Sequence, residues 1–346
     1  MKNNNTLQKQ VVIHLLASKE YSGAENVACT LINHFQNDYN IFYCSPNGSV
    51  NAELIKRNIN FIPLKSLTIK EVKRVIKKYK PDIIHAHDYK ATIISALFCA
   101  KNVKIVSHIH KNDPCMKKVS LKSLLFRLSS RNIFKIIGVS ASILDEYIFK
   151  NSIKSKYVII PNYIDSNEIL KKSQEYSINE KYDLFYFGRF SPEKNPLSFI
   201  NIVNNIKQNN ASIKAVMIGD GILKKDCEKI IKKYDLLDNI KIVGFKSNPY
   251  PYILNSNIGI MPSIYEGFGI TAIESLILNK IVLNSGVGGL KEIFKDNSEF
   301  ICSNEGEYVK KIINIKDISN SIVDISNYTD LNKWKKKILD VYDSLK

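Results

Sequence analysis

The chain has 346 residues, 45% of them hydrophobic, and a formal net charge of +17 at pH 7, which gives room for two domains with a core each. It holds no uninterrupted run of 18 apolar residues and no apolar segment typical of a signal peptide, so we expect a cytoplasmic protein without transmembrane helices. The six cysteines are scattered without a Cys-x-x-Cys pair, which favours free thiols over disulfides or a zinc site.

The positive charge is spread along the chain together with many Ile and Asn residues. This distribution indicates a compositional bias and not one basic patch. No RNP-like, zinc-finger or helix-turn-helix pattern accompanies the charge. We therefore expect no nucleic-acid partner, whereas an anionic substrate or an anionic lipid surface fits the composition.

The first half of the chain alternates strand-like and helix-like segments. A buried-type strand at 10–16 leads through the loop Tyr21-Ser22-Gly23-Ala24-Glu25 into a helix. The next predicted elements are, in order, strand 40–44, helix 51–57, strand 59–63, helix 69–79 and strand 82–87. This order predicts a parallel, doubly wound α/β sheet, and such sheets bind ligands beyond the carboxyl ends of their strands.

All six histidines lie in the first 110 residues, and four of them form two His-x-His pairs, His85 with His87 and His108 with His110. Residues two apart share one face of a strand, so each pair could bind a metal with Asp88 nearby. However, no third-ligand pattern recurs, and both pairs end strands where a doubly wound sheet opens its crevice. We therefore favour core or ligand-contacting histidines and predict no metal.

A basic amphipathic stretch covers 114–135. Its cations are Lys117, Lys118, Lys122, Arg127, Arg131 and Lys135, and Val, Leu, Phe and Ile residues lie between them. A solvated surface helix has this pattern, and so does a helix that lies in a membrane interface. The pattern alone does not separate the two interpretations.

A strand at 134–139, a short helix and a strand at 157–160 complete the first predicted domain, 1–165. The polar run 166–181 is the predicted linker, and 182–329 is the predicted second domain. Near the C-terminus, apolar residues at helical spacing predict one more packed helix: Leu331, Trp334, Ile338, Tyr342 and Leu345.

The second domain repeats the strand-loop-helix pattern. Its first predicted strand, 183–187, is followed by a loop with Arg189 and Lys194 and by a helix at 197–208. The spacing lets both cations reach a diphosphate, Arg through a fork of donors and Lys as a point charge. The remaining predicted strands are 214–218, 240–243, 257–261, 281–283 and 300–302.

Two carboxylates flank the start of a predicted helix at 270–278. Glu266 lies in the loop before this helix and Glu274 about a turn and a half inside it, so both can face one ligand across the helix N-terminus. That N-terminus favours anions. A nucleotide-sugar fits this geometry if Glu266 binds the sugar hydroxyls, Glu274 binds the ribose hydroxyls and the helix receives the diphosphate.

Several segments resemble retaining GT-B glycosyltransferases of family 4, the group 1 glycosyl transferases, and in particular bacterial capsule and lipopolysaccharide members. They are the Glu-x7-Glu segment from Glu266 to Glu274, the loop from Gly188 to Asn195, Gly219-Asp220-Gly221, Ser22-Gly23-Ala24-Glu25 and His108-Ile109-His110-Lys111-Asn112. The resemblance implies two doubly wound, Rossmann-like domains that face each other across a cleft. It also implies that the helix at 330–346 packs back on the first domain.

The resemblance further implies roles for single residues. His110 matches a histidine that contacts the donor sugar, and Arg189 and Lys194 match cations that stabilise the leaving diphosphate. Ser22 stands where the family usually has a glycine, so Gly23 is the position where we expect close backbone approach. The residues implied in donor binding are Gly23, Gly188, Gly219, Gly221, Gly267, Phe268, Gly269 and Glu274.

The implied reaction is the transfer of a sugar, with retention, from a nucleotide-sugar to a hydroxyl group of a glycan or lipid-linked acceptor in bacterial cell-surface polysaccharide synthesis. We expect a UDP-sugar donor as co-substrate, and neither a cofactor nor a metal. A lipid-linked acceptor favours peripheral contact of the 114–135 stretch with the inner face of the cell membrane. Two alternatives stay open: a same-fold enzyme such as a nucleotide-sugar epimerase or glycosyl phosphorylase, and a non-enzymatic basic protein that binds nucleic acid or membrane.

Overall fold

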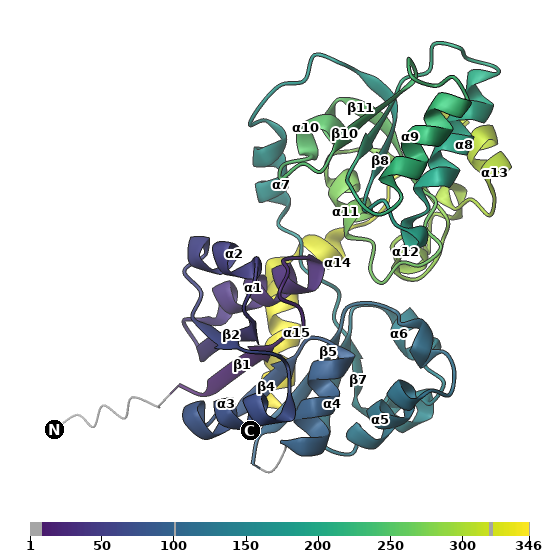
Figure 1. The fold of residues 1–346 in the computed structure, drawn as a ribbon. Helices are drawn as coiled ribbons and strands as arrows, with labels where there is room; N and C mark the ends of the chain where they lie inside the picture. The colour runs from purple at the N-terminus through teal and green to yellow at the C-terminus, as the bar shows by residue number, and fades with distance from the viewer. Residues whose placement is uncertain (1–8, 100–101, 318–320, 346) are drawn as a thin grey trace. The chain divides into compact units, whose positions relative to one another are not determined.

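The computed structural model describes residues 9–99, 102–317 and 321–345. The chain forms two compact units (Figure 1). The first unit comprises the chain up to Pro161 together with Asn332–Lys346, and the second comprises Asn162–Leu331. Each unit is built on one parallel sheet whose strands alternate with helices.

The first unit has a seven-stranded sheet in the order β3-β2-β1-β4-β5-β6-β7. Its strands are β1 (Val11–Leu15), β2 (Asn40–Pro46), β3 (Phe61–Leu64), β4 (Ile83–Ala86), β5 (Lys104–Ile109), β6 (Ile133–Gly138) and β7 (Tyr157–Ile159). All neighbours are parallel. Every residue of β4 is buried, as is usual in parallel sheets that are covered on both faces.

The helices of the first unit are α1 (Gly23–Phe35), α2 (Val50–Lys56), α3 (Ile69–Tyr79), α4 (Tyr89–Phe98), α5 (Leu121–Ser129), α6 (Ala141–Asp145) and α15 (Leu331–Asp343), with 3-10 turns η1 (Pro114–Met116), η2 (Lys150–Ser152) and η3 (Lys154–Lys156). Side-chain caps start several of them. Thr68 accepts from Glu71 N at α3, and Asp88 accepts from Ala91 N at α4. A second bond to Asp88, from Ala17 N at 2.9 Å, ties α4 to the loop after β1.

The C-terminal helix α15 packs on the first unit, among elements that the chain formed some 300 residues earlier (Figure 1). Four of the five residues in its predicted apolar stripe are buried: Trp334, Ile338, Tyr342 and Leu345. The Tyr342 ring packs edge-on against Tyr39, and its hydroxyl lies 2.8 Å from Nδ1 of His85 on β4. The helix therefore completes the core of this unit.

The second unit has a five-stranded parallel sheet in the order β10-β9-β8-β11-β12. Its strands are β8 (Tyr182–Phe187), β9 (Ala215–Ile218), β10 (Ile240–Gly244), β11 (Ser256–Met261) and β12 (Ile281–Asn284). Its helices are α7 (Ser166–Ser173), α8 (Pro196–Lys207), α9 (Lys224–Lys233), α10 (Tyr250–Leu254), α11 (Ile270–Ile277), α12 (Gly289–Ile293), α13 (Glu305–Ile313) and α14 (Ser326–Thr329), with 3-10 turns η4 (Pro192–Lys194), η5 (Ser298–Phe300) and η6 (Ile315–Asp317).

The polar run 166–181 differs from the expected irregular linker. Its first half is helix α7, and Asp165 caps this helix by accepting from the N–H groups of Asn167 and Glu168 at 3.0 and 3.1 Å. Ile169 is buried, and α7 packs against α10 and α11. The segment is thus part of the second unit.

Two other segments also differ from the sequence-based expectation. The stretch 114–135 is not one amphipathic helix but η1, the nine-residue helix α5 and the start of β6. The predicted strand 300–302 is reduced to one parallel bridge between Asn284 and Ile301 after the turn η5.

Candidate active site

The strand order of the second sheet reverses at β8, which has β9 on one side and β11 on the other. Connections from β8 and β11 therefore leave the sheet in opposite directions, and ligands of doubly wound folds bind at such a switch point. The loop after β8 carries Arg189 and Lys194, and the loop after β11 carries Glu266.

The structure brings Lys194 and Glu266 together across this switch point. Lys194 Nζ donates to Glu266 Oε2, and the two side chains are only 24% and 9% exposed. The backbones of the two loops are joined as well, because Ile264 N and Tyr265 N donate to Glu193 O at 2.8 and 3.2 Å. A cation and a carboxylate are thus held side by side by loops that follow neighbouring strands.

Arg189 is the second cation of the β8 loop, and its side chain is exposed. Its backbone is fixed on both sides. Tyr186 Oη donates to Arg189 O at 2.8 Å, and the next residue, Phe190, is fully buried. Among the described residues the Arg189 guanidinium has no hydrogen-bond partner, so its fork of donors is available to an anion.

Three glycines bring loop backbones close together at the carboxyl ends of β8 and β9. Gly188 N donates to Ile218 O at 3.0 Å, and a Cβ on Gly219, which has φ of 143°, would lie 1.9 Å from Gly188 O. A Cβ on Gly221 would lie 2.4 Å from Phe190 O. Side chains do not fit at Gly219 and Gly221, so this edge presents backbone groups.

The Glu266 loop is supported by the turn that precedes α12. A Cβ on Gly288, which has φ of 56°, would lie 1.7 Å from Glu266 O, and Gly289 N donates to the same oxygen at 3.2 Å. The position of Glu266 therefore depends on a glycine in the left-handed region 22 residues further along the chain.

The remaining residues of this loop lead into α11. Gly267 follows Glu266, and Gly269 is the N-cap residue of α11 with φ of 92°. Phe268 was expected in donor binding, but its ring is buried and packs edge-on against Tyr328. A ligand could therefore meet the backbone of Phe268 and not its side chain.

Glu274 lies on α11, half-buried, and its Oε1 accepts a hydrogen bond of 2.9 Å from Tyr250 Oη on α10. Burial raises the pKa of Glu274 from 4.5 to about 7, and the Tyr250 hydrogen bond opposes that rise. The carboxyl group therefore holds its proton to a higher pH than a free glutamate. Tyr250 had no role in the sequence-based hypothesis, because nothing in the sequence marks a tyrosine 24 residues away as its partner.

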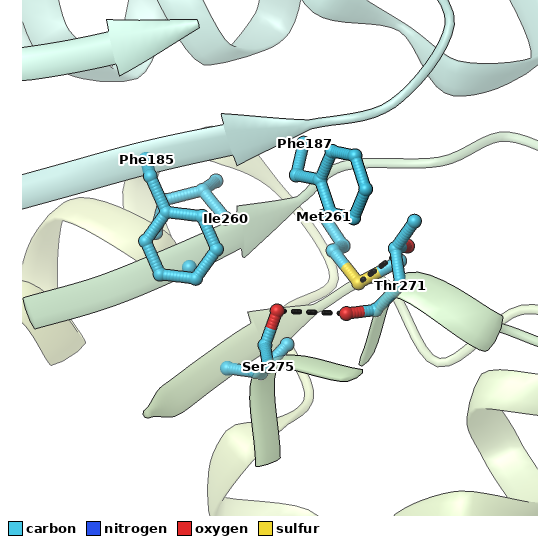
Figure 2. A pocket seen from close by; sticks show the side chains of 8 residues that line it. Phe185, Phe187, Ile260, Met261, Thr271 and Ser275 are labelled. Atoms are coloured by element: carbon cyan, nitrogen blue, oxygen red, sulfur yellow. Dashed lines mark hydrogen bonds between the residues drawn. The ribbon is translucent and has the colours of Figure 1, made fainter. Parts of the chain in front are cut away.

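Under α11 the sheet leaves a small hollow lined by residues of β8, β11, β12 and α11 (Figure 2). Figure 2 shows Thr271 Oγ1 donating to Met261 Sδ at 3.7 Å and Ser275 Oγ donating to Thr271 O at 2.7 Å. The hollow cannot hold a water molecule. It is a packing feature that fixes α11 to the sheet, and it does not contain the predicted site residues.

The first unit contributes two predicted site residues at the carboxyl edge of its own sheet. Gly23 is the exposed first residue of α1, after the loop that follows β1. Behind it, Ser22 Oγ donates to the buried carboxylate of Glu25. His110 follows β5 and is partly exposed, with Nε2 at 2.9 Å from Nδ1 of His87.

Five histidines of the first unit lie close together, and four of them, His14, His85, His87 and His108, are buried. Burial lowers the pKa of both His14 and His110 to about 3 and holds the pKa values of His85, His87 and His108 well below 6.5. His14, which the His-x-His pattern does not include, joins them because its strand β1 pairs with β4 in the register His14 to His85. Asp88 is occupied by the backbone N–H groups of Ala17 and Ala91, so it serves the fold.

Helix α5 carries its apolar residues on the outside. Leu121, Leu124 and Leu128, which share one helix face, are 76%, 40% and 49% exposed, whereas Ser123 and Phe126 are buried. Lys117 and Lys118 precede the helix, and Arg127 lies within it over the ring of Phe149. Along the described residues no helix combines the length and the apolarity that crossing a bilayer requires.

Comparison with known proteins gives matches to both units. A family model described as Glycosyl transferases group 1 matches 168–332, and one described as Glycosyltransferase Family 4 matches 21–168. A capsular polysaccharide biosynthesis glycosyltransferase of Staphylococcus aureus, CapH, is 23% identical over 96% of this chain and 98% of its own length. An uncharacterized glycosyltransferase of Methanocaldococcus jannaschii is 25% identical, over 62% of this chain and 58% of the relative.

Two further relatives bear on the fold and the family. The N-acetylgalactosamine-N,N'-diacetylbacillosaminyl-diphospho-undecaprenol 4-alpha-N-acetylgalactosaminyltransferase of Campylobacter jejuni is 23% identical over 80% of both chains. The crystal structure of Anabaena Alr3699/HepE in complex with UDP superposes with a TM-score of 0.82 at 16% identity, over 97% of this chain and all of the other. The expected pair of doubly wound units is therefore confirmed as a known two-unit fold.

Proposed function

Because the chain belongs to the family 4, group 1 glycosyltransferases with the GT-B fold, we propose that it transfers a hexosyl group from a UDP-sugar to a hydroxyl group of a glycan or lipid-linked acceptor, with retention of configuration. The observation that carries this proposal is the pairing of Lys194 with Glu266 at the β8/β11 switch point, with Arg189 exposed in the same loop as Lys194. Family membership favours transfer over the epimerase and over a non-enzymatic basic protein, neither of which needs this set of groups together with an acceptor.

The diphosphate of the donor is assigned to the two cations and to the N-terminus of α11. Arg189 offers free donors, and Lys194 can exchange its bond to Glu266 for a bond to phosphate. Preorganised cations of this kind stabilise the charge that develops on the leaving nucleoside diphosphate. The donor set therefore supplies the required charge from side chains and backbone, and the proposal assigns no metal.

The two glutamates are assigned to opposite ends of the donor. Glu274 lies on helix α11, and its neighbour Tyr250 lies on α10. Glu274 accepts hydrogen bonds from the ribose hydroxyls. Glu266 accepts hydrogen bonds from the transferred sugar once Lys194 has turned to the diphosphate. Gly188, Gly219 and Gly221 present backbone groups to the nucleotide, and His110, at the carboxyl edge of the first sheet, keeps its predicted role as a sugar-contacting residue.

In the proposed reaction, the acceptor oxygen attacks the anomeric carbon from the face on which the diphosphate leaves. The C1–O bond to phosphate breaks as the new glycosidic bond forms, and a phosphate oxygen of the leaving group takes the hydroxyl proton. No enzyme carboxylate becomes covalently attached. The products are the retained glycoside and the nucleoside diphosphate.

The choice of donor and acceptor is supported by the relatives and by helix α5. The structural neighbour binds UDP, and the Campylobacter relative is named for a diphospho-undecaprenol acceptor. Exposed leucines flanked by cations suit a helix that lies in the interface of an anionic membrane, where a lipid-linked acceptor is presented. We therefore assign α5 to peripheral contact with the inner face of the cell membrane and the enzyme to cell-surface polysaccharide synthesis.

A thermal-shift series with UDP-, GDP-, ADP- and CMP-sugars tests the donor assignment. A ligand present at 100 times its dissociation constant adds about 2.7 kcal/mol to the stability of the folded state, so UDP-sugars should raise the unfolding temperature above that with the other three. Stabilisation by none of the four classes would contradict the proposed function. Conversion of a UDP-sugar to its epimer without acceptor would favour the epimerase instead.

A further inference from the structure

The two oxygens of the Glu274 carboxyl group have different surroundings. Oε1 accepts a hydrogen bond of 2.9 Å from Tyr250 Oη, at the start of helix α10. Oε2 accepts no hydrogen bond from the described residues. Both residues belong to the second unit. A carboxylate can accept at both oxygens, so one oxygen of Glu274 is held by the protein and the other is available to a ligand.

The backbone that carries Tyr250 is fixed. Pro249 and Pro251 lie on either side of it, and each proline ring locks its own φ. Asn248 ties this turn to helix α7, because its Oδ1 accepts from Tyr250 N at 3.3 Å and its Nδ2 donates to Lys172 O at 2.8 Å. The Tyr250 hydroxyl is therefore a donor that stays in place when Glu274 moves.

Glu274, in contrast, has a side chain with several rotatable bonds. Ordering such a side chain when a ligand binds costs rotamer entropy. A partner that orders it beforehand removes this cost from the binding step. Because Tyr250 fixes Oε1, the direction of Oε2 is set before a ligand arrives.

The charged groups that face Glu274 come from α7. Lys172 favours the ionised carboxylate, and it is itself paired with Glu168 at 2.5 Å. Strands β11 and β12, which also pack against α11, carry no titratable side chain. Burial raises the pKa of Glu274 to about 7, and the hydrogen bond from Tyr250 opposes this rise more than Lys172 does.

We propose that Tyr250 is a positioning residue, which holds Glu274 by Oε1 so that Oε2 accepts a hydrogen bond from a ribose hydroxyl of the donor nucleotide. The ribose rests on the proposed function, whereas the hold on Glu274 rests on the geometry of the second unit. The alternative is a bond that only joins α10 to α11. Its loss would lower stability without changing how the protein recognises ribose.

Tyr250→Phe keeps the ring and removes only the hydroxyl group. Calorimetric titration with UDP and with 2′,3′-dideoxy-UDP at pH 8 measures what the ribose hydroxyls contribute to affinity. The wild type should prefer UDP by about tenfold or more, because the hydroxyls donate to a charged group. Tyr250→Phe should reduce this preference about three- to tenfold, because groups in one network are coupled. An unchanged preference would overturn the positioning role.

Tyr252→Phe is the matched control, because it removes a hydroxyl group from the same helix. The Tyr252 ring lies under Lys246 Nζ at 5.7 Å, and its hydroxyl makes no hydrogen bond within the part of the chain that the structure describes. This variant should keep the wild-type preference for UDP. Equal losses of preference in Tyr250→Phe and Tyr252→Phe would show that α10 acts through its packing and not through the Tyr250 hydroxyl.

Titration of the Glu274 carboxyl carbon by 13C NMR, assigned from the Glu274→Gln spectrum, gives a readout that needs no ligand. The midpoint in the wild type should lie at about pH 7. It should move to higher pH in Tyr250→Phe, because a hydrogen bond donated to the ionised form is lost. An unchanged midpoint would contradict the hold of Tyr250 on Glu274.

A double-mutant cycle shows whether Tyr250 acts through Glu274. In the Glu274→Gln background, Tyr250→Phe should change the preference for UDP by less than about twofold, because the group that it positions has been replaced. A loss as large as in the wild-type background would reveal another route. Equal affinity of the wild type for UDP and 2′,3′-dideoxy-UDP would overturn the ribose contact here and in the proposed function, whereas an unchanged carboxyl midpoint would overturn only the positioning by Tyr250.

Discussion

Single residues set the chemistry of the second unit, and the Lys194–Glu266 pair is the clearest case. Lys194 donates to the Glu266 carboxylate, so a nucleoside diphosphate that binds as proposed would have to compete with Glu266 for Lys194. This arrangement lets one lysine serve two partners in turn. The effect of replacing Lys194 or Glu266 alone therefore includes the cost of leaving the other charge without its partner.

Arg189 and Lys194 should each matter for the leaving group. Arg189→Ala or Lys194→Ala should lower turnover by on the order of 100-fold, because each removes a cation that faces charge in the transition state. Lys229→Ala, on the exposed side of α9, serves as the matched control and should keep full turnover. Steady-state rates with saturating UDP-sugar decide the matter, and wild-type rates in both active-site variants would refute the assignment.

For single residues, the sequence predicts only part of the candidate site. The loops with Arg189, Lys194 and Glu266 are recognisable as strand-loop-helix segments with glycines and charges. The ion pair between Lys194 and Glu266 is not recognisable in the sequence, because it forms only where β8 and β11 are neighbours in the sheet. Tyr250 and His14 were missed for the same reason, because each becomes a partner only through tertiary packing.

Elements were predictable where local signals agree. The predicted bounds of α3, 69–79, are confirmed, and Thr68 caps the helix by accepting from Glu71 N. Helix α7 was missed although Asp165 is a capping residue, because its polar composition resembles a linker. The basic stretch 114–135 was predicted as amphipathic, but periodicity cannot tell that α5 turns its serines inward and its leucines outward.

The exposed leucines of helix α5 allow a test of the proposed membrane contact. Replacing Leu121, Leu124 and Leu128 with Ser should weaken binding to vesicles that contain anionic lipid by on the order of 1 kcal/mol per leucine. Neutralising Lys118 should cost about 1 kcal/mol more, whereas Lys117 and Lys122 are already paired with Glu146 and Asp113.

A control for the effect of net charge comes from α3 of the same unit. Replacing Lys73, Lys77 and Lys78 with Gln removes three exposed positive charges without touching an apolar face. Vesicle sedimentation at low salt should therefore show a larger loss for the leucine variant than for this control. Equal partition of the leucine variant and the wild type would show that α5 is only a solvated helix.

At the scale of the whole molecule, the two units should differ in their response to acid. The histidines whose pKa is lowered, His14, His85, His87, His108 and His110, are all in the first unit, and the second unit contains no histidine. Below pH 6.5 the unfolded chain takes up protons that these folded rings bind only at a pH well below 6.5. The free energy of unfolding of the first unit therefore falls as the pH falls, by up to about 1.4 kcal/mol per pH unit for each histidine.

Trp334 makes this prediction measurable, since it is the only tryptophan and lies buried in the first unit. Thermal unfolding followed by its fluorescence should shift to lower temperature between pH 7 and pH 5. The transition of the second unit, followed by circular dichroism, should shift less. A Trp334 transition that does not move over this range would mean that the histidines are not held neutral.

Doubly wound sheets can be predicted from the alternation of strands and helices along the chain. Alternating strand and helix signals predicted both sheets, and the packing of the 330–346 helix on the first unit followed from the family resemblance. The register that gathers five histidines from three strands could not be predicted, because it depends on β1 pairing with β4 across some 70 residues of chain.

In the proposed complex, the β8/β11 switch point binds a nucleotide-sugar with the ribose at Glu274 and the sugar at Glu266. Calorimetric titration with UDP and with a UDP-sugar at pH 8, where Glu274 with its pKa of about 7 is ionised, tests it most directly. Glu274→Gln should weaken both ligands by about 1.5 to 3 kcal/mol, the value of charged hydrogen bonds. Glu266→Gln should weaken only the UDP-sugar, and it should leave UDP binding unchanged or tighter because Lys194 is released. Equal losses for UDP in the two variants, or no binding of either ligand by the wild type, would contradict the account.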